Sequence, residues 1–181
     1  MKLALARREF GAGGGAELYL QRLIGALRDE GHGVVLVTAD AKANPDGVEV
    51  RRVPLAGSRS ARVAQFDEGV RDALAGVPVD CLFSLERLSR QDVLRAGDGV
   101  HASWLEQRRR FSPAWKRWLV GRGAFHRAMV ELEARAFAPV NSRHLIINSE
   151  MVGHDVRARF GFPVDRMHLV RNGVEAERWR R

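Results

Sequence analysis

A glycine run between an apolar segment and a helical repeat constrains the fold of this chain most strongly. Residues 3–6 are short and apolar, and the run Gly11-Ala-Gly-Gly-Gly15 follows a few positions later. Leucine and isoleucine then recur at three- and four-residue spacing over 18–27, which predicts an amphipathic helix, and 34–37 predict a second buried strand. Gly31 is suited to end the helix as a C-cap. Together these elements predict a βαβ unit with a right-handed crossover.

The glycine loop at Gly13, Gly14 and Gly15 is the first candidate site. A glycine-rich turn that opens a helix directs backbone N–H groups toward an anion, above all a phosphate. In one alternative the glycines only relieve steric crowding between strand and helix. In another, residues 11–16 fit the dinucleotide fingerprint and Asp40 is its ribose-binding acid, which would make this an NAD-binding domain. The spacing from the glycines to Asp40 is long for that fingerprint.

The rest of the chain alternates strand and helix signals. Strands are predicted over 48–54 near a sheet edge, and over 79–85, 92–96, 145–149 and 167–170, with helices over 61–74, 124–138 and 150–160. This alternation predicts an α/β fold, with a Rossmann-like, doubly wound and mainly parallel sheet flanked by helices. In the helix over 124–138, Glu133 is expected among the solvated charges. Functional residues of such sheets follow the carboxyl ends of the strands.

Four polar residues follow two of these strands. Asp98 and His101 are three positions apart after a short strand, and such a pair can polarise or hold a hydroxyl group. The alternative is that both only cap the next helix. Glu86 and Arg87 follow the preceding strand. Arg87 could contact an acceptor phosphate, or pair with Glu86 or Asp92.

Several short motifs in the sequence resemble those of glycosyltransferase family 4. They are Gly14-Gly15-Ala16-Glu17 at the helix start, Gly31-His32-x-Val before the second strand, and Asn172-Gly173-Val174-Glu175 near the end. The segment from Leu85-Glu86-Arg87 to Gly99-Val100-His101 is similar to bacterial members that act on the lipopolysaccharide core. The resemblance implies a GT-B enzyme that transfers a hexose, with retention, from a nucleotide sugar to a lipopolysaccharide-core or other glycolipid acceptor. It implies neither a metal nor a cofactor.

The resemblance also implies roles for individual residues. Asp98 and His101 would be catalytic, the loop Gly13–Gly15 would approach the donor phosphates and the acceptor, and Glu86 and Arg87 would contact the acceptor. Residues 1–171 would form the N-terminal, acceptor-side domain, and 172–181 the start of an interdomain linker. The family's second domain, which binds most of the nucleotide sugar, has no counterpart in these 181 residues. The chain alone is therefore expected to be inactive.

Residues 104–127 combine aromatic and basic side chains in a chain of net charge +8. The candidate surface residues are Trp104, Arg108, Arg109, Arg110, Trp115, Lys116, Arg117 and Trp118. Such a segment can lie on an anionic membrane, where indoles favour the headgroup region. It can also stack RNA bases and neutralise phosphates, or it can pack its aromatics inward under a solvated basic face. The resemblance favours a peripheral protein on the inner face of the cytoplasmic membrane, and nucleic acid is not expected.

Overall fold

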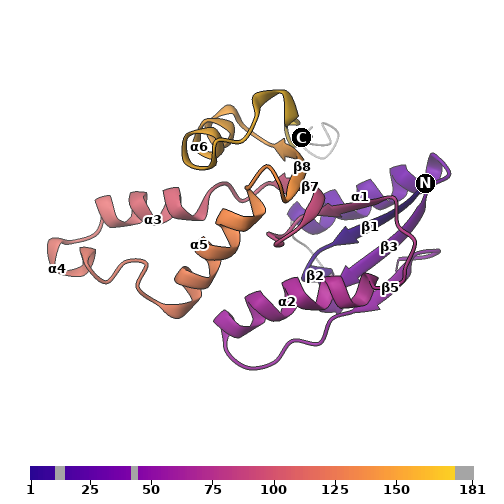
Figure 1. Cartoon of the computed structure of the whole chain (residues 1–181), viewed down its shortest axis with the longest axis horizontal. Helices are drawn as coiled ribbons and strands as arrows, with labels where there is room; N and C mark the ends of the chain where they lie inside the picture. The colour runs from indigo at the N-terminus through magenta and orange to yellow at the C-terminus, as the bar shows by residue number, and fades with distance from the viewer. Residues whose placement is uncertain (11–14, 42–44, 174–181) are drawn as a thin grey trace, which may run out of the picture.

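The computed structural model describes residues 1–10, 15–41 and 45–173. Within these ranges, seven strands form one sheet in the order β5-β3-β1-β6-β7-β8-β9 (Figure 1). Its strands are β1 (Lys2–Ala6), β3 (Gly33–Thr38), β5 (Glu49–Arg52), β6 (Cys81–Ser84), β7 (Gln91–Ala96), β8 (Ser142–Ile147) and β9 (Met167–Leu169). Every neighbouring pair is parallel. This confirms the predicted doubly wound, Rossmann-like α/β class, with the third predicted strand at an edge.

The helices connect successive strands and flank the sheet. They are α1 (Gly15–Asp29), α2 (Arg59–Leu74), α3 (His101–Arg110), α4 (Ala114–Arg117), α5 (Ala124–Ala136) and α6 (Glu150–Phe160), with a short 3₁₀ turn, η1 (Val164–Arg166). Helix α2 begins two residues earlier than predicted because Ser58 caps it, its Oγ accepting from the Ala61 N–H at 3.2 Å. The predicted unit β1–α1–β3 is confirmed, with β1 and β3 paired in parallel.

Side chains alternate between the two faces of the sheet, and each face has its own helices. One apolar cluster joins the sheet to α1 and includes Leu5, Leu20, Ile24, Leu36 and Phe83. A second joins the opposite face to α2 and includes Ala6, Val35, Val37, Phe66 and Val70. A third, at the β7–β8 end, packs α5 and α6 through Phe137, Val152, Val156 and Phe162. Burial of these apolar surfaces is the main stabilisation of the fold.

Two short elements complete the edge of the sheet where the predicted site residues lie. Strands β2 (Glu9–Phe10) and β4 (Asp40–Ala41) pair in parallel just beyond the carboxyl ends of β1 and β3. After β7 the chain leaves the sheet along α3 and α4, which project away from it, and returns along α5 (Figure 1). The start of α3 is thereby held near the sheet, while α4 lies far from it.

Candidate functional site

Parallel strands bring the predicted site residues to one edge of the sheet. Glu86 and Arg87 follow β6, and Asp98 follows β7, so all three come after carboxyl ends that lie side by side. They line one small recess together with Arg95 and Phe137. His101 is the first residue of α3, three positions after Asp98. The structure therefore brings together the two segments from which the sequence predicted catalytic and acceptor-binding residues.

Glu86 is held by the chain that leaves β1. Its carboxylate lies 3.1 Å from Arg7 Nη1 and 3.4 Å from Arg8 Nη2, and it also accepts from the Arg8 backbone N–H. Arg7 is in addition 3.9 Å from Glu17 in the first turn of α1. These contacts link the ends of β1 and β6 to the helix that follows the glycine loop. Gly15 begins that helix, whereas Gly13 and Gly14 lie outside the described residues.

Arg87 pairs with neither of the two acids that the sequence suggested. Its Nε donates to Glu133 Oε1 at 2.9 Å, and its Nη2 donates to the carbonyl of Gly99 at 2.7 Å. Asp92 is engaged elsewhere, accepting from the Leu82 N–H. The guanidinium is therefore committed to a partner on α5, 46 residues away in the chain.

Glu133 is the main residue that the sequence interpretation missed. It was expected to be solvated, but its side chain is 0% exposed. Besides pairing with Arg87, it accepts from the backbone N–H of His101 at 2.6 Å and of Ala102 at 3.0 Å, and so caps the start of α3. A signal was available in the sequence, because residue 133 lies four positions before Phe137 and shares the apolar face of α5.

The capping function considered for Asp98 and His101 thus belongs to Glu133. The N-cap position of α3 is Val100, which makes no side-chain cap. Asp98 is exposed in a turn that Gly99 shapes with a φ of +69°, and within the described ranges its carboxylate has no hydrogen bond or ion pair. The Asp98 carboxylate is therefore available to accept a hydrogen bond from a ligand hydroxyl.

His101 lies in an aromatic cluster. Its Nε2 is 3.0 Å from Nδ1 of His126, its ring stacks on Trp104 at 5.4 Å between centroids, and Phe125 meets it edge-on at 6.2 Å. Burial lowers the pKa of His101 below its usual value; the nearby Glu133 carboxylate opposes this shift, while Arg87 and His126 add to it. A lowered pKa favours the neutral imidazole, which can accept a proton or a hydrogen bond.

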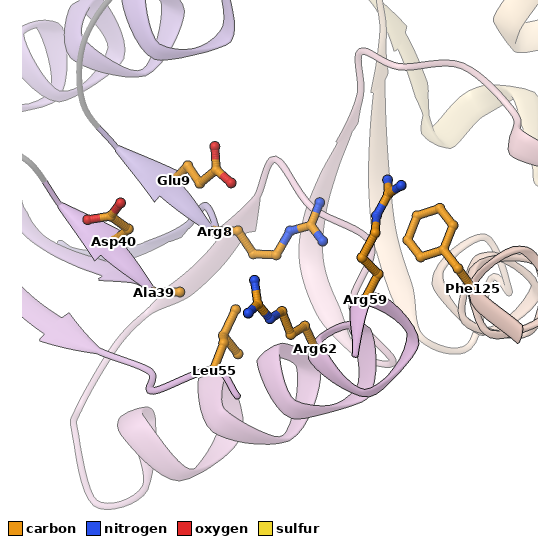
Figure 2. Close-up of a pocket in the computed structure, with 8 residues that line it drawn as sticks. All are labelled: Arg8, Glu9, Ala39, Asp40, Leu55, Arg59, Arg62 and Phe125. Carbon is orange, nitrogen blue, oxygen red and sulfur yellow. The ribbon is translucent and has the colours of Figure 1, made fainter. Parts of the chain in front are cut away.

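A cavity of about 400 Å³ lies at the same edge, beside the carboxyl ends of β1 and β3 (Figure 2). Its lining consists of Arg8, Glu9, Ala39, Asp40, Leu55, Arg59, Arg62 and Phe125. From the sequence, Asp40 was considered as a ribose-binding acid and Phe125 was placed in the aromatic and basic segment 104–127, but the other lining residues had no assigned role. The available signal was a pair of arginines, three positions apart, in a first helical turn that contains no acid.

The basic and aromatic segment does not pack its aromatics inward. Phe111 is 80% exposed, Trp115 67% and Trp118 58%, and Trp104 is also exposed. Cations lie over several of these rings, including Lys116 over Trp115 at 4.5 Å. Across the described ranges, no helix has both the length and the apolar character needed to cross a bilayer. Helices α3 and α4 therefore present an exposed mixture of indoles and cations.

Comparison with known proteins decides the family. Residues 13–178 match the family model described as Glycosyltransferase Family 4. The chain belongs to glycosyltransferase family 4. A comparison with curated protein sequences found no match.

Solved structures similar to this family 4 chain confirm the fold. The glycosyltransferase WaaG, described as involved in lipopolysaccharide biosynthesis, superposes with a TM-score of 0.84 at 18% identity, over 97% of this chain and 46% of WaaG. A ugt transferase from Siraitia grosvenorii, in complex with UDP, gives 0.51 at 14% identity over 98% and 50%. Phytolacca americana UGT2, complexed with UDP-2fluoro-glucose and pterostilbene, gives 0.53 at 11% identity over 96% and 53%. The family 4 chain spans about half of each, and its sheet corresponds to one half of a GT-B fold.

Proposed function

We propose that this family 4 chain is the acceptor-binding half of a retaining hexosyltransferase. It would act with a donor-binding half to move a hexose from a nucleotide sugar to a hydroxyl of a lipopolysaccharide-core or other glycolipid acceptor. The observation that carries the proposal is the exposed Asp98 carboxylate, which has no hydrogen bond or ion pair among the described residues and lies next to Glu86, three residues before the partly buried His101. Carboxylates and imidazoles are the groups that orient and deprotonate sugar hydroxyls.

In this half, some residues contact the acceptor hydroxyl and others position the residues that do. Asp98 accepts a hydrogen bond from the acceptor hydroxyl, and the neutral His101 imidazole helps to orient it. Arg87 and Glu133 hold the turn at Gly99 and the first N–H groups of α3, and so position both Asp98 and His101. Fixing one hydroxyl in reacting geometry removes part of the entropic cost of transfer.

The test uses a protein that carries both halves. Asp98→Asn and His101→Gln are each expected to lower hexose transfer by about 10²-fold or more, the lower end of typical acid–base and orienting contributions. Asp165→Asn and His154→Gln change the same residue types at exposed positions away from the site, and transfer should stay within about twofold. Unchanged transfer in both site variants would exclude their proposed roles.

We further propose that α3 and α4 hold the enzyme on an anionic membrane. The support is that Trp115 on α4 and Trp118 directly after it are exposed among cations. Helices α3 and α4 project from the sheet (Figure 1). Each cation near an anionic surface contributes about 1 kcal/mol. This surface would bring the site edge to a glycolipid acceptor.

Vesicle sedimentation tests the membrane surface. Changing Arg108, Arg109 and Arg110 together to Ser should abolish pelleting with phosphatidylglycerol vesicles, while the triple change Arg71, Arg135 and Arg157 to Ser, on α2, α5 and α6, should leave most of it. Equal pelleting of the two triple variants would contradict the proposal. So would a preference for single-stranded RNA over vesicles, which would favour a nucleic-acid surface instead.

A further inference from the structure

Three arginines from two distant segments line the 400 Å³ cavity beside the proposed acceptor residues. Arg8 comes from the chain between β1 and β2, and Arg59 and Arg62 come from the first turn of α2. In Figure 2 these side chains border a common space, with Glu9 and Asp40 on the side opposite α2. The cavity therefore has a cationic side and an acidic side.

The structure gives these cations little internal neutralisation. Arg8 shares the Glu86 carboxylate with Arg7, and Arg59 lies over the Phe125 ring at 4.4 Å. No hydrogen bond or ion pair engages the Arg62 guanidinium anywhere in the described ranges. Cations in a first helical turn also oppose the helix dipole, so Arg59 and Arg62 do not serve to stabilise α2.

The two sides of the cavity match two kinds of ligand group. Guanidinium groups donate in a planar fork that suits phosphate oxygens. Carboxylates such as those of Glu9 and Asp40 accept hydrogen bonds from sugar hydroxyls. A volume of about 400 Å³ lies within the usual range for small-molecule sites. This combination fits a phosphorylated sugar better than either an inorganic anion or a neutral sugar.

We propose that this cavity binds a phosphorylated sugar unit of the acceptor, an inference that rests on the proposed function. Arg8, Arg59 and Arg62 hold the phosphate, and Glu9 and Asp40 hold ring hydroxyls. Two contacts join the cavity to the reacting edge. Phe125 lines the cavity and meets the His101 ring edge-on, and Arg8 pairs with Glu86, which lines the recess with Asp98.

The binding test needs only this chain and simple probes. Calorimetric titration with mannose 6-phosphate, mannose and inorganic phosphate separates the contributions of sugar and phosphate. Mannose 6-phosphate is expected to bind at least 10-fold more tightly than either of the others. Arg59→Gln and Arg62→Gln should each weaken its binding 10-fold or more. The control Arg71→Gln removes the same charge from the last turn of α2, and binding should change by less than twofold.

Three results would overturn the inference. These are inorganic phosphate binding as tightly as the sugar phosphate, mannose binding as tightly as its phosphate, and Arg71→Gln weakening binding as much as Arg62→Gln does. A transfer assay on the protein with both halves separates this inference from the proposed function. If Arg62→Gln leaves the KM for a phosphorylated acceptor unchanged while Asp98→Asn lowers kcat, only the cavity assignment fails. If Arg62→Gln raises the KM while Asp98→Asn and His101→Gln have no effect, only the proposed catalytic roles fail.

Discussion

The Glu133→Gln variant removes a buried negative charge while nearly preserving the side-chain shape. In the native chain this carboxylate accepts from Arg87 at 2.9 Å and from the first two N–H groups of α3. Removing one partner of a buried ion pair costs about 3–5 kcal/mol, because the other charge stays buried. Arg87 is 13% exposed and keeps its bond to the Gly99 carbonyl, so we expect the lower end, about 3 kcal/mol.

Thermal unfolding followed by circular dichroism measures this loss. For a chain of this size, 1 kcal/mol corresponds to about 2–4 °C, so the Tm of Glu133→Gln should fall by about 6–12 °C. The control Glu131→Gln removes the same charge two residues earlier on α5, where the carboxylate is exposed and paired with Arg135. It should cost no more than about 0.5 kcal/mol. Equal Tm values for the two variants would refute the buried pair and its capping role.

Three further predictions concern packing, pH and the exposed surface. Gly69→Ala should destabilise the fold by about 1 kcal/mol, because a Cβ there would lie 2.2 Å from buried Val53 Cγ1 and overpacking outweighs the gain in helix propensity. At Gly25 a Cβ meets nothing within 4 Å, so Gly25→Ala should instead stabilise the fold by about 0.5–1 kcal/mol. Denaturant titration measures both unfolding free energies, and the opposite ranking would contradict the packing. Because the pKa of His101 is lowered in the folded chain, the unfolded chain binds this proton first as pH falls, and the free energy of unfolding should decrease below about pH 6.5. An equally steep decrease in the His101→Gln variant would contradict this. Trp115→Ser should change the unfolding free energy by less than about 0.5 kcal/mol but weaken vesicle binding, whereas a large loss of stability would mean that the ring is packed.

The elements predicted best from the sequence were those specified by local chemistry. The unit β1–α1–β3 follows from a helical repeat between two apolar runs, and Gly31 has the positive φ, +77°, that a C-cap requires. Ser149 caps α6, its Oγ accepting from the Val152 N–H, as a serine directly before a helix commonly does. Gly161 ends the same helix in the left-handed region. Each of these features depends on residues only a few positions apart.

The site was predicted less completely because its contacts join distant segments. The sequence indicated that Asp98 and His101 follow the same strand, but not that Glu133, from α5, would cap the helix in their place. The arginine cavity depends on the approach of β1 and α2, about fifty residues apart, and no local pattern specifies that approach. A charged residue in a helix is predicted to be solvated unless a buried partner is known, and the sequence did not show that Arg87 would lie beside Glu133.

The proposed function requires that the edge of the sheet carrying Asp98 and His101 binds the acceptor. Amide chemical-shift mapping of this chain with a deacylated lipopolysaccharide-core oligosaccharide tests it most directly. The largest shifts should fall at Arg8, Gly99 and His101, with little change at Asn141, which precedes β8 at the opposite edge. Shifts concentrated around Asn141 would contradict the proposed function. So would the absence of any shift at oligosaccharide concentrations that saturate transfer by the protein with both halves.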